Sequence, residues 1–220
     1  MPTVAEQMAE RRERILEAAR EIIAVQGFEG LTVRALAEAA RVTVPTIYNL
    51  IGSKDQVLLA TVAEQTERWV RGIERAGGDV VPIIDANNRE LLRRPRYYRS
   101  LLRLMRTSKD AAPAARSVER VLRDQIRGAL GELAEQGGIE RWVDLDALTT
   151  ELVHSLRNSN VAWAEGRIPS RRFPMRQRYA AALILLGVSR GAARRDFEIL
   201  ARESQSSDAR TSGGHRGATS

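Results

Sequence analysis

Residues 31–58, LTVRALAEAARVTVPTIYNLIGSKDQVL, contain two short helical patterns separated by a tight break and followed by the start of a third helix. Thr32 is placed to cap the first helix, and Leu31 before it can pack on Leu36 as a hydrophobic staple. The face that this helix is expected to bury carries Val33, Leu36, Ala37 and Ala40. The first pattern therefore predicts a short amphipathic helix.

The second pattern begins at Thr43, which has the side chain of an N-cap, and Pro45 lies in the first turn, where its missing N–H costs nothing. Ile47 and Ile51, four residues apart, give the helix one apolar side, and Gly52 ends it. The remaining surface of the helix carries Val44, Thr46, Tyr48 and Asn49.

A further helix starts directly afterwards, with Ser53 as its cap and Asp55 in its first turn. Two short helices joined by a turn of three or four residues form a helix-turn-helix, whose second helix enters the major groove of DNA. Residues 31–58 therefore predict a DNA-binding motif.

The same residues resemble the DNA-binding domain of TetR-family transcriptional repressors. That family's signature runs from a Thr-aliphatic-Tyr triplet, here residues 46–48, to a Gly/Pro-Ser-Lys-acidic turn, here residues 52–55. The resemblance covers about the first 60 residues and includes Gln26-Gly27-Phe28 and Leu31-Thr32-Val33. It implies a repressor with a small helical head and a larger helical body that binds an effector and dimerises.

Three residues depart from the family pattern. Leu50 stands where a histidine is frequent, Ile51 where an aromatic residue is usual, and Arg41 where the turn often has glycine. Ile51 preserves the packing, whereas Leu50 changes a potential phosphate contact. Arg41 requires the turn to tolerate a side chain.

The N-terminal end of the second helix points at base edges in motifs of this kind, so Thr46 is placed to hydrogen-bond a base or a phosphate. Tyr48 and Lys54 suit phosphate contacts, and by analogy with the family Thr32 presents its hydroxyl and backbone N–H to phosphate. The residues predicted to contact DNA are Thr32, Arg34, Thr43, Val44, Pro45, Thr46, Tyr48, Asn49 and Lys54. The alternative is that the two threonines only cap helices and that Tyr48 only packs.

The composition fits a globular protein of 220 residues with 43% hydrophobic and 29% charged residues. The chain has no cysteine, which excludes disulfides, cysteine nucleophiles and thiolate metal sites. The N-terminus has no apolar signal-peptide core, and the longest apolar run, residues 180–188, is too short to span a bilayer. We therefore expect a cytoplasmic protein without a membrane segment.

The net charge of +7 does not come from the motif, since residues 1–54 carry seven basic and seven acidic side chains. Residues 89–127 carry twelve basic and four acidic side chains, and their role is left open. The prediction of DNA binding thus rests on the motif and not on bulk charge.

Helical periodicity continues along the whole chain and predicts an all-α fold. Helices are expected over 6–26, 53–75, 82–94, 95–107, 111–136, 144–165 and 175–189, besides the two of the motif and a last helix to about residue 203. We predict a three-helix DNA-binding head over residues 1–53, a ligand-binding and dimerisation bundle over 54–203, and a disordered Ser/Gly-rich tail over 204–220.

A homodimer would place two recognition helices in successive major grooves of a palindromic operator. Residues 180–188 are apolar all round, and the stripe from Leu145 to Trp163 offers a partner face. The predicted dimer interface consists of Leu152, Leu156, Trp163, Ala181, Ile184, Leu185 and Val188. The alternative is that these residues form the central helices of a monomeric bundle.

A small-molecule effector of unknown identity is expected to bind among the aromatic, soft and amide residues of the body. The candidates are Trp69, Tyr98, Leu102, Met105, His154, Asn158 and Trp163. The alternative for each is ordinary core, which these spacings favour, and a lone helical histidine such as His154 is more often a satisfied hydrogen-bonder than a ligand contact.

The sequence contains no nucleophile–base pair, no HExxH motif and no paired carboxylate–histidine cluster, so we expect no enzyme, no metal site and no cofactor. The favoured function is a ligand-responsive repressor that binds double-stranded DNA. The alternatives are an activator that uses the same motif and a helical protein-interaction module.

Overall fold

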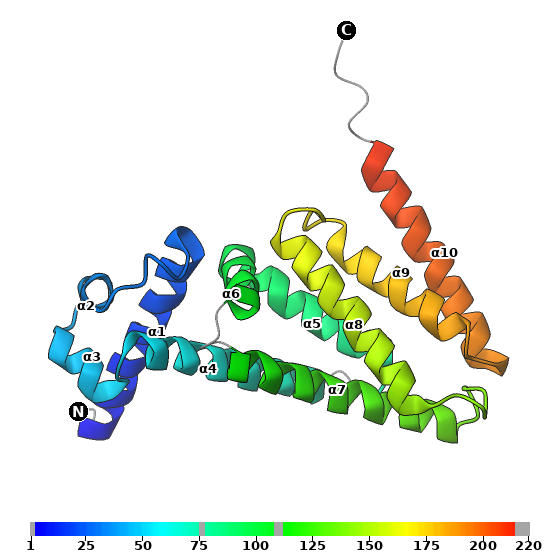
Figure 1. The fold of residues 1–220 in the computed structure, drawn as a ribbon, viewed down its shortest axis with the longest axis horizontal. Helices are drawn as coiled ribbons and strands as arrows, with labels where there is room; N and C mark the ends of the chain where they lie inside the picture. The colour runs from blue at the N-terminus through cyan, green and yellow to red at the C-terminus, as the bar shows by residue number, and fades with distance from the viewer. Residues whose placement is uncertain (1–2, 75–77, 108–111, 214–220) are drawn as a thin grey trace, which may run out of the picture. The chain divides into compact units, whose positions relative to one another are not determined.

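The computed structural model describes residues 3–74, 78–107 and 112–213, which form ten helices and one isolated β-bridge between Ile139 and Ser189 (Figure 1). The helices are α1 (Val4–Gln26), α2 (Val33–Ala40), α3 (Val44–Leu50), α4 (Lys54–Glu74), α5 (Val80–Arg93), α6 (Pro95–Thr107), α7 (Ala112–Glu135), α8 (Leu145–Ala164), α9 (Phe173–Leu186) and α10 (Gly191–Gly213). This confirms the predicted all-α fold. None of the described helices is long and apolar enough to cross a membrane.

The chain divides into two compact units. Unit 1 comprises Met1–Arg68 and Arg94–Val118, and unit 2 comprises Trp69–Arg93 and Glu119–Ser220. Helix α4 begins in unit 1 and ends in unit 2. The predicted boundaries at residues 53 and 203 separate functional parts, and they stay a prediction. The two compact units are divided differently, because the start of α4 and all of α6 belong to the unit that holds the helix-turn-helix.

Unit 1 is organised around α1, which packs on α2, α3 and α6. Its apolar face supplies Ile15, Leu16 and Ile23, all without solvent exposure. Thr3 begins this helix with a capping box, because its hydroxyl accepts from the Glu6 N–H while the Glu6 carboxylate accepts from the Thr3 N–H. A long capped helix thus forms the platform on which the two short helices lie.

Unit 2 has its own apolar core, to which α5, α7, α8 and α9 contribute. Helix α9 packs on α8, α5 and α10. The guanidinium of Arg178 on α9 binds the carboxylate of Asp85 on α5, with Nε 2.6 Å from Oδ1. Core packing and this ion pair hold α9 between its neighbours, as Figure 1 shows within this unit.

The predicted tail differs from the structure, because α10 continues to Gly213 instead of ending near residue 203. Ser204 is buried, and the Ser206 hydroxyl donates to the carbonyl of Arg202, which pairs with Glu198 one turn earlier. Extending an existing helix costs far less than nucleating one, so a serine-rich segment can stay helical when its first turn is anchored. Residues 214–220 lie outside the described residues.

The turn between α2 and α3 stores backbone strain at Arg41, whose φ of 53° and ψ of 49° lie in the left-handed region. Replacing Arg41 by valine should lower the free energy of unfolding by about 1–2 kcal/mol, because a β-branched residue tolerates this conformation poorly. Arg41→Gly should lose no stability. Urea denaturation of the two variants and Arg41→Ala checks this, and equal midpoints for glycine and valine would refute it.

Candidate nucleic-acid interface

The first helix of the motif is fixed at its N-terminus by Thr32, whose hydroxyl accepts a hydrogen bond from the Ala35 N–H at 3.1 Å. Leu31 and Leu36 are both buried, as the predicted hydrophobic staple requires. The Thr32 side chain nevertheless remains exposed. Capping and contact with a phosphate are therefore compatible roles for this residue.

The recognition helix α3 is capped by Thr43, whose hydroxyl lies 2.8 Å from that of Thr46 and 3.4 Å from the Thr46 N–H. Ile47 is completely buried and anchors the helix to the rest of the unit. Pro45 occupies the first turn, as predicted. This seven-residue helix is thus capped at its start and held by a single buried side chain.

The opposite side of α3 faces solvent. Tyr48 is 55% and Val44 37% exposed, Pro45 and Asn49 are exposed, and Thr46 is half-buried. Large exposed side chains on a seven-residue helix do not contribute to its own packing, so this surface is available for a partner. The alternative role of Tyr48 as a packing residue does not fit this exposure.

Lys54 begins α4, and its ammonium lies 4.1 Å from the centre of the Phe28 ring. This cation–π contact, which was not predicted, fixes the direction of a flexible side chain. Ser53 and Gln56 exchange hydrogen bonds as in a capping box, with the Ser53 N–H 2.8 Å from Gln56 Oε1. The predicted cap at Ser53 is confirmed, and Lys54 is held next to the end of α3.

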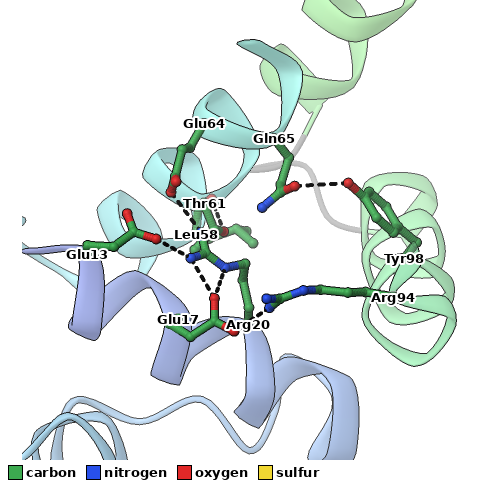
Figure 2. Close-up of polar contacts among 9 residues, drawn as sticks. All are labelled: Glu13, Glu17, Arg20, Leu58, Thr61, Glu64, Gln65, Arg94 and Tyr98. Carbon is green, nitrogen blue, oxygen red and sulfur yellow. Dashed lines mark hydrogen bonds and ion pairs between the residues drawn. The ribbon is translucent and has the colours of Figure 1, made fainter. Parts of the chain in front are cut away.

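Arg20 is buried, with only 1% of its surface exposed, whereas the other arginines of the head are exposed. Figure 2 shows its surroundings. Its three nitrogens donate to three glutamates at 2.7–2.8 Å, namely Glu13, Glu17 and Glu64. The first two lie on α1 and the third on α4. Arg20 therefore cannot contact DNA, and it joins the platform helix to the helix that follows the motif.

Arg94, directly before α6, extends this network by binding the second carboxylate oxygen of Glu17, and Tyr98 of α6 separately donates to Gln65 of α4 at 3.0 Å (Figure 2). Burial opposes the charge of Arg20, but its three acceptors raise its pKa above the ordinary value. Burial likewise opposes the charge of Glu17, and hydrogen bonds from Arg94 and Arg20 outweigh it and lower the pKa of that carboxyl.

The predicted effector residues are divided between the two units. Tyr98, Leu102 and Met105 belong to unit 1, and the other four belong to unit 2. Trp163 has no solvent exposure, stacks on Phe173 at 5.0 Å between ring centres, and donates to the Ser170 hydroxyl. Trp163 is thus a core residue, whereas His154 and Asn158 are exposed on α8.

The structure corrects the predicted dimer interface. The side chains that pack in the chain's own core, each at most 1% exposed, are Leu152, Leu156, Trp163, Ala181 and Leu185. Only Ile184 and Val188 of the predicted set reach solvent. These side chains are buried as expected, but they pack against helices of the same chain and not against a partner. This matches the alternative of central helices in a bundle.

The outer side of α8 and α9 has an open hollow of ≈ 450 Å³. Its lining includes His154, Ser155, Asn158, Ser159, Arg176, Ala180 and Ile184. Leu183, on the same side of α9, is 47% exposed. Among the described residues, no group of three or more histidine, aspartate or glutamate side chains is placed to hold a metal ion.

Comparison with known proteins assigns this motif to a family. The family model described as "Bacterial regulatory proteins, tetR family" matches residues 15–61, which contain the end of α1, all of α2 and α3, and the start of α4. The chain belongs to the TetR family. It is therefore a DNA-binding transcriptional regulator, a class whose members are not enzymes.

Named relatives agree with this assignment. The chain is 28% identical to the HTH-type transcriptional repressor AcnR of Corynebacterium diphtheriae, in an alignment that covers 69% of this chain and 80% of the relative. It is 38% identical to the repressor KstR of Mycolicibacterium smegmatis, over 33% of this chain and 35% of the relative.

Solved structures share the fold. A TetR transcription regulator from Haloarcula marismortui superposes with a TM-score of 0.70 at 16% identity, covering 83% of this chain and all of that one. The fold is thus shared with a protein of very different sequence.

Removing the charge of Arg20 should destabilise the protein, because three carboxylates would remain together without their cation. We expect Arg20→Met to lower the free energy of unfolding by about 3 kcal/mol, the lower end of the range for a broken buried ion pair, since the glutamates reach solvent. Arg12→Met, at an exposed position of the same helix, is the matched control and should change little.

The difference in stability between wild type and Arg20→Met should depend on pH. Because the pKa of Glu17 is lowered in the folded protein, its stabilising contribution is complete above the ordinary value of 4.5 and is lost as the pH falls through the lowered value. The difference in melting temperature between wild type and Arg20→Met should therefore narrow below pH 4.5. Equal melting temperatures for the two methionine variants at pH 7 would contradict the assignment.

Proposed function

We propose that this TetR-family chain is a dimeric repressor, which binds a palindromic operator through α3 and is released from it by a small-molecule effector. The observation that carries the proposal is the solvent-facing side of α3, with Val44, Pro45, Tyr48 and Asn49 displayed on a capped and anchored helix. Repression is supported by the relatives, which are named as transcriptional repressors.

The N-terminal turn of α3 is proposed to read base edges. Val44 and Pro45 are short and can approach the floor of the groove, and a valine methyl group can contact the methyl group of thymine. The hydroxyls of Thr43 and Thr46 are already hydrogen-bonded to each other, so one of them keeps a proton or a lone pair for a base or a phosphate. Asn49 can extend this contact along the groove.

The flanks of the motif are proposed to hold the phosphate backbone. Tyr48 presents a phenol on a rigid ring, and Lys54 presents a cation whose direction is set by Phe28. Thr32 lies at the N-terminus of α2, where backbone N–H groups attract an anion, and Arg34 is exposed in the first turn of the same helix. With no net charge on residues 1–54, a few placed contacts carry the electrostatic part of binding.

A second copy of the chain is proposed to cover the outer side of α8 and α9. Ser155, Ser159 and Ala180 are small enough to let two helix backbones approach, and Leu183 exposes an apolar side chain beside the hollow. Dimerisation also places two recognition helices about 34–36 Å apart, one helical turn of DNA. We accordingly assign the interface to this outer side and not to the buried stripe.

Release by an effector requires that it bind the DNA-free arrangement more tightly than the DNA-bound one. Helix α4 starts four residues after the end of α3 and continues into unit 2, so it is the proposed route by which an effector in the body changes the two heads. Because the protein is proposed to act on operator DNA, a cytoplasmic site of action is proposed with it. Activation through the same motif is the second candidate.

DNA binding is tested by a gel-shift titration with the promoter fragment upstream of the protein's own gene. Wild type should bind it in preference to unrelated DNA, and Lys54→Ala should reduce the slope of log affinity against log salt by about one. Tyr48→Ala should also weaken binding. Arg195→Ala, at an exposed position of α10, is the control for loss of one positive charge outside the motif. Absence of any specific shift by wild type would reject the DNA-binding proposal.

Dimerisation is tested by sedimentation at micromolar concentration. Leu183→Glu should convert the dimer to a monomer, because it places a charge in an interface that excludes water. Leu59→Glu is a matched control, since Leu59 on α4 is similarly exposed at 42%. A monomeric wild type would refute the dimer, and a dimeric Leu183→Glu would place the interface elsewhere.

A further inference from the structure

Two adjacent amides interrupt the buried face of α5. Val80, Ile83, Ile84 and Leu91 define that face, and Asn87 and Asn88 lie on it, each four residues after an isoleucine. Asn87 is 6% and Asn88 3% exposed. Apolar residues would be expected at both positions of a helix that only had to pack.

The Asn88 side chain is unpaired at both ends: neither its amide nitrogen nor its amide oxygen has a hydrogen-bond partner among the described residues. The amide nitrogen of Asn87 is likewise unpaired. Buried polar groups in folded proteins are almost always hydrogen-bonded, and asparagine is also a poor helix former. Two such residues on one buried face therefore carry a cost that packing does not offset.

A third unpaired donor lies in the apolar core to which α5 contributes. The indole N–H of Trp69 on α4 is buried without a partner, and Trp69 clusters with Ile83 and Ile84 of α5. Trp69 is among the predicted effector residues, whereas the two asparagines are not. The signal available for them was an adjacent pair of amides at positions where the α5 periodicity calls for apolar side chains.

We propose that Asn87, Asn88 and Trp69 form the polar contact of the effector site, and that the effector is an uncharged molecule with a hydrogen-bond-accepting oxygen on an apolar body. This inference rests on the proposed effector-responsive function and names the ligand chemistry. The donors are two amide groups and one indole, against a single free acceptor, Asn88 Oδ1, so the ligand supplies mainly acceptors. A ketone, an ester or an ether oxygen fits.

Among the described residues of unit 2, no fully buried side chain carries a charge, which argues for a neutral effector. The buried polar residues described in this unit are Asn87, Asn88, Thr149, Gln177, Ser189 and Ser204. A carboxylate or ammonium that entered beside α5 would lose its hydration without gaining an opposite charge. A neutral carbonyl would accept hydrogen bonds from the amides, while its hydrocarbon part would contact the apolar cluster.

The first arm of the test needs no ligand. Asn88→Leu removes unpaired polar atoms and should raise the melting temperature of the purified protein by roughly 2–6 °C. Asn160→Leu is the matched control with the opposite sign, because Asn160 Oδ1 accepts from the buried Gln177 Nε2 at 2.7 Å. A lower melting temperature for Asn88→Leu would show that the amide has a structural partner and would overturn the assignment.

The second arm compares three probes of equal chain length: octan-2-one, octanoate and octylammonium. At millimolar concentration the ketone should raise the melting temperature of wild type more than either ion, and Asn88→Leu should lose that shift. A larger shift with either ion, an unchanged shift in the variant, or no shift with any probe would overturn the proposed chemistry.

A gel shift separates this inference from the proposed function. If Asn88→Leu still binds promoter DNA and no longer responds to octan-2-one, both proposals are supported. If wild type binds no DNA but the ketone shift still depends on Asn88, the repressor proposal fails and the ligand assignment stands.

Discussion

The buried charge of Arg20 is the constraint on which the presentation of the DNA-binding motif depends. A guanidinium removed from water must have its donors satisfied, and its acceptors come from two helices, Glu13 and Glu17 on α1 and Glu64 on α4. Because α2 and α3 pack on α1, an arrangement of α1 and α4 that satisfies Arg20 also fixes where α3 begins and where α4 leaves it. We regard this network as a source of conformational specificity more than of stability, since a well-packed apolar cluster of the same volume would stabilise the unit about as well.

In helix α3, some residues stabilise the helix and others are exposed for binding. Seven residues cannot form a stable helix alone, so α3 exists only because Thr43 caps it, Pro45 presets its first turn and Ile47 anchors it. These residues use one side and one end of the helix. The remaining side of the helix has no structural role, so its residues can vary with the operator.

Local signals in the sequence predicted most of this fold. Caps, glycine stops and apolar spacing located the helices to within a few residues, because those signals act within one or two turns. Periodicity shows that a face is buried but not against what, so Leu152, Leu156 and Leu185 were assigned to a partner chain although they pack within their own. The Arg20 network was not predicted for the same reason, because its acceptors include Glu64, forty-four residues away. The DNA-contact residues remain a prediction that their exposure supports.

Arg20 and Asn88 are both deeply buried polar groups, and the difference between them is informative. Every nitrogen of the Arg20 guanidinium has an acceptor within 2.8 Å, so nothing is left for a ligand and the group serves the fold. The Asn88 amide has no partner among the described residues, so the folded protein carries its desolvation cost without compensation. A ligand that completes those hydrogen bonds recovers that cost only in the conformation that buries the amide. Such a ligand therefore gains differential affinity for one arrangement of the chain, which is the property that an effector must have to shift an equilibrium.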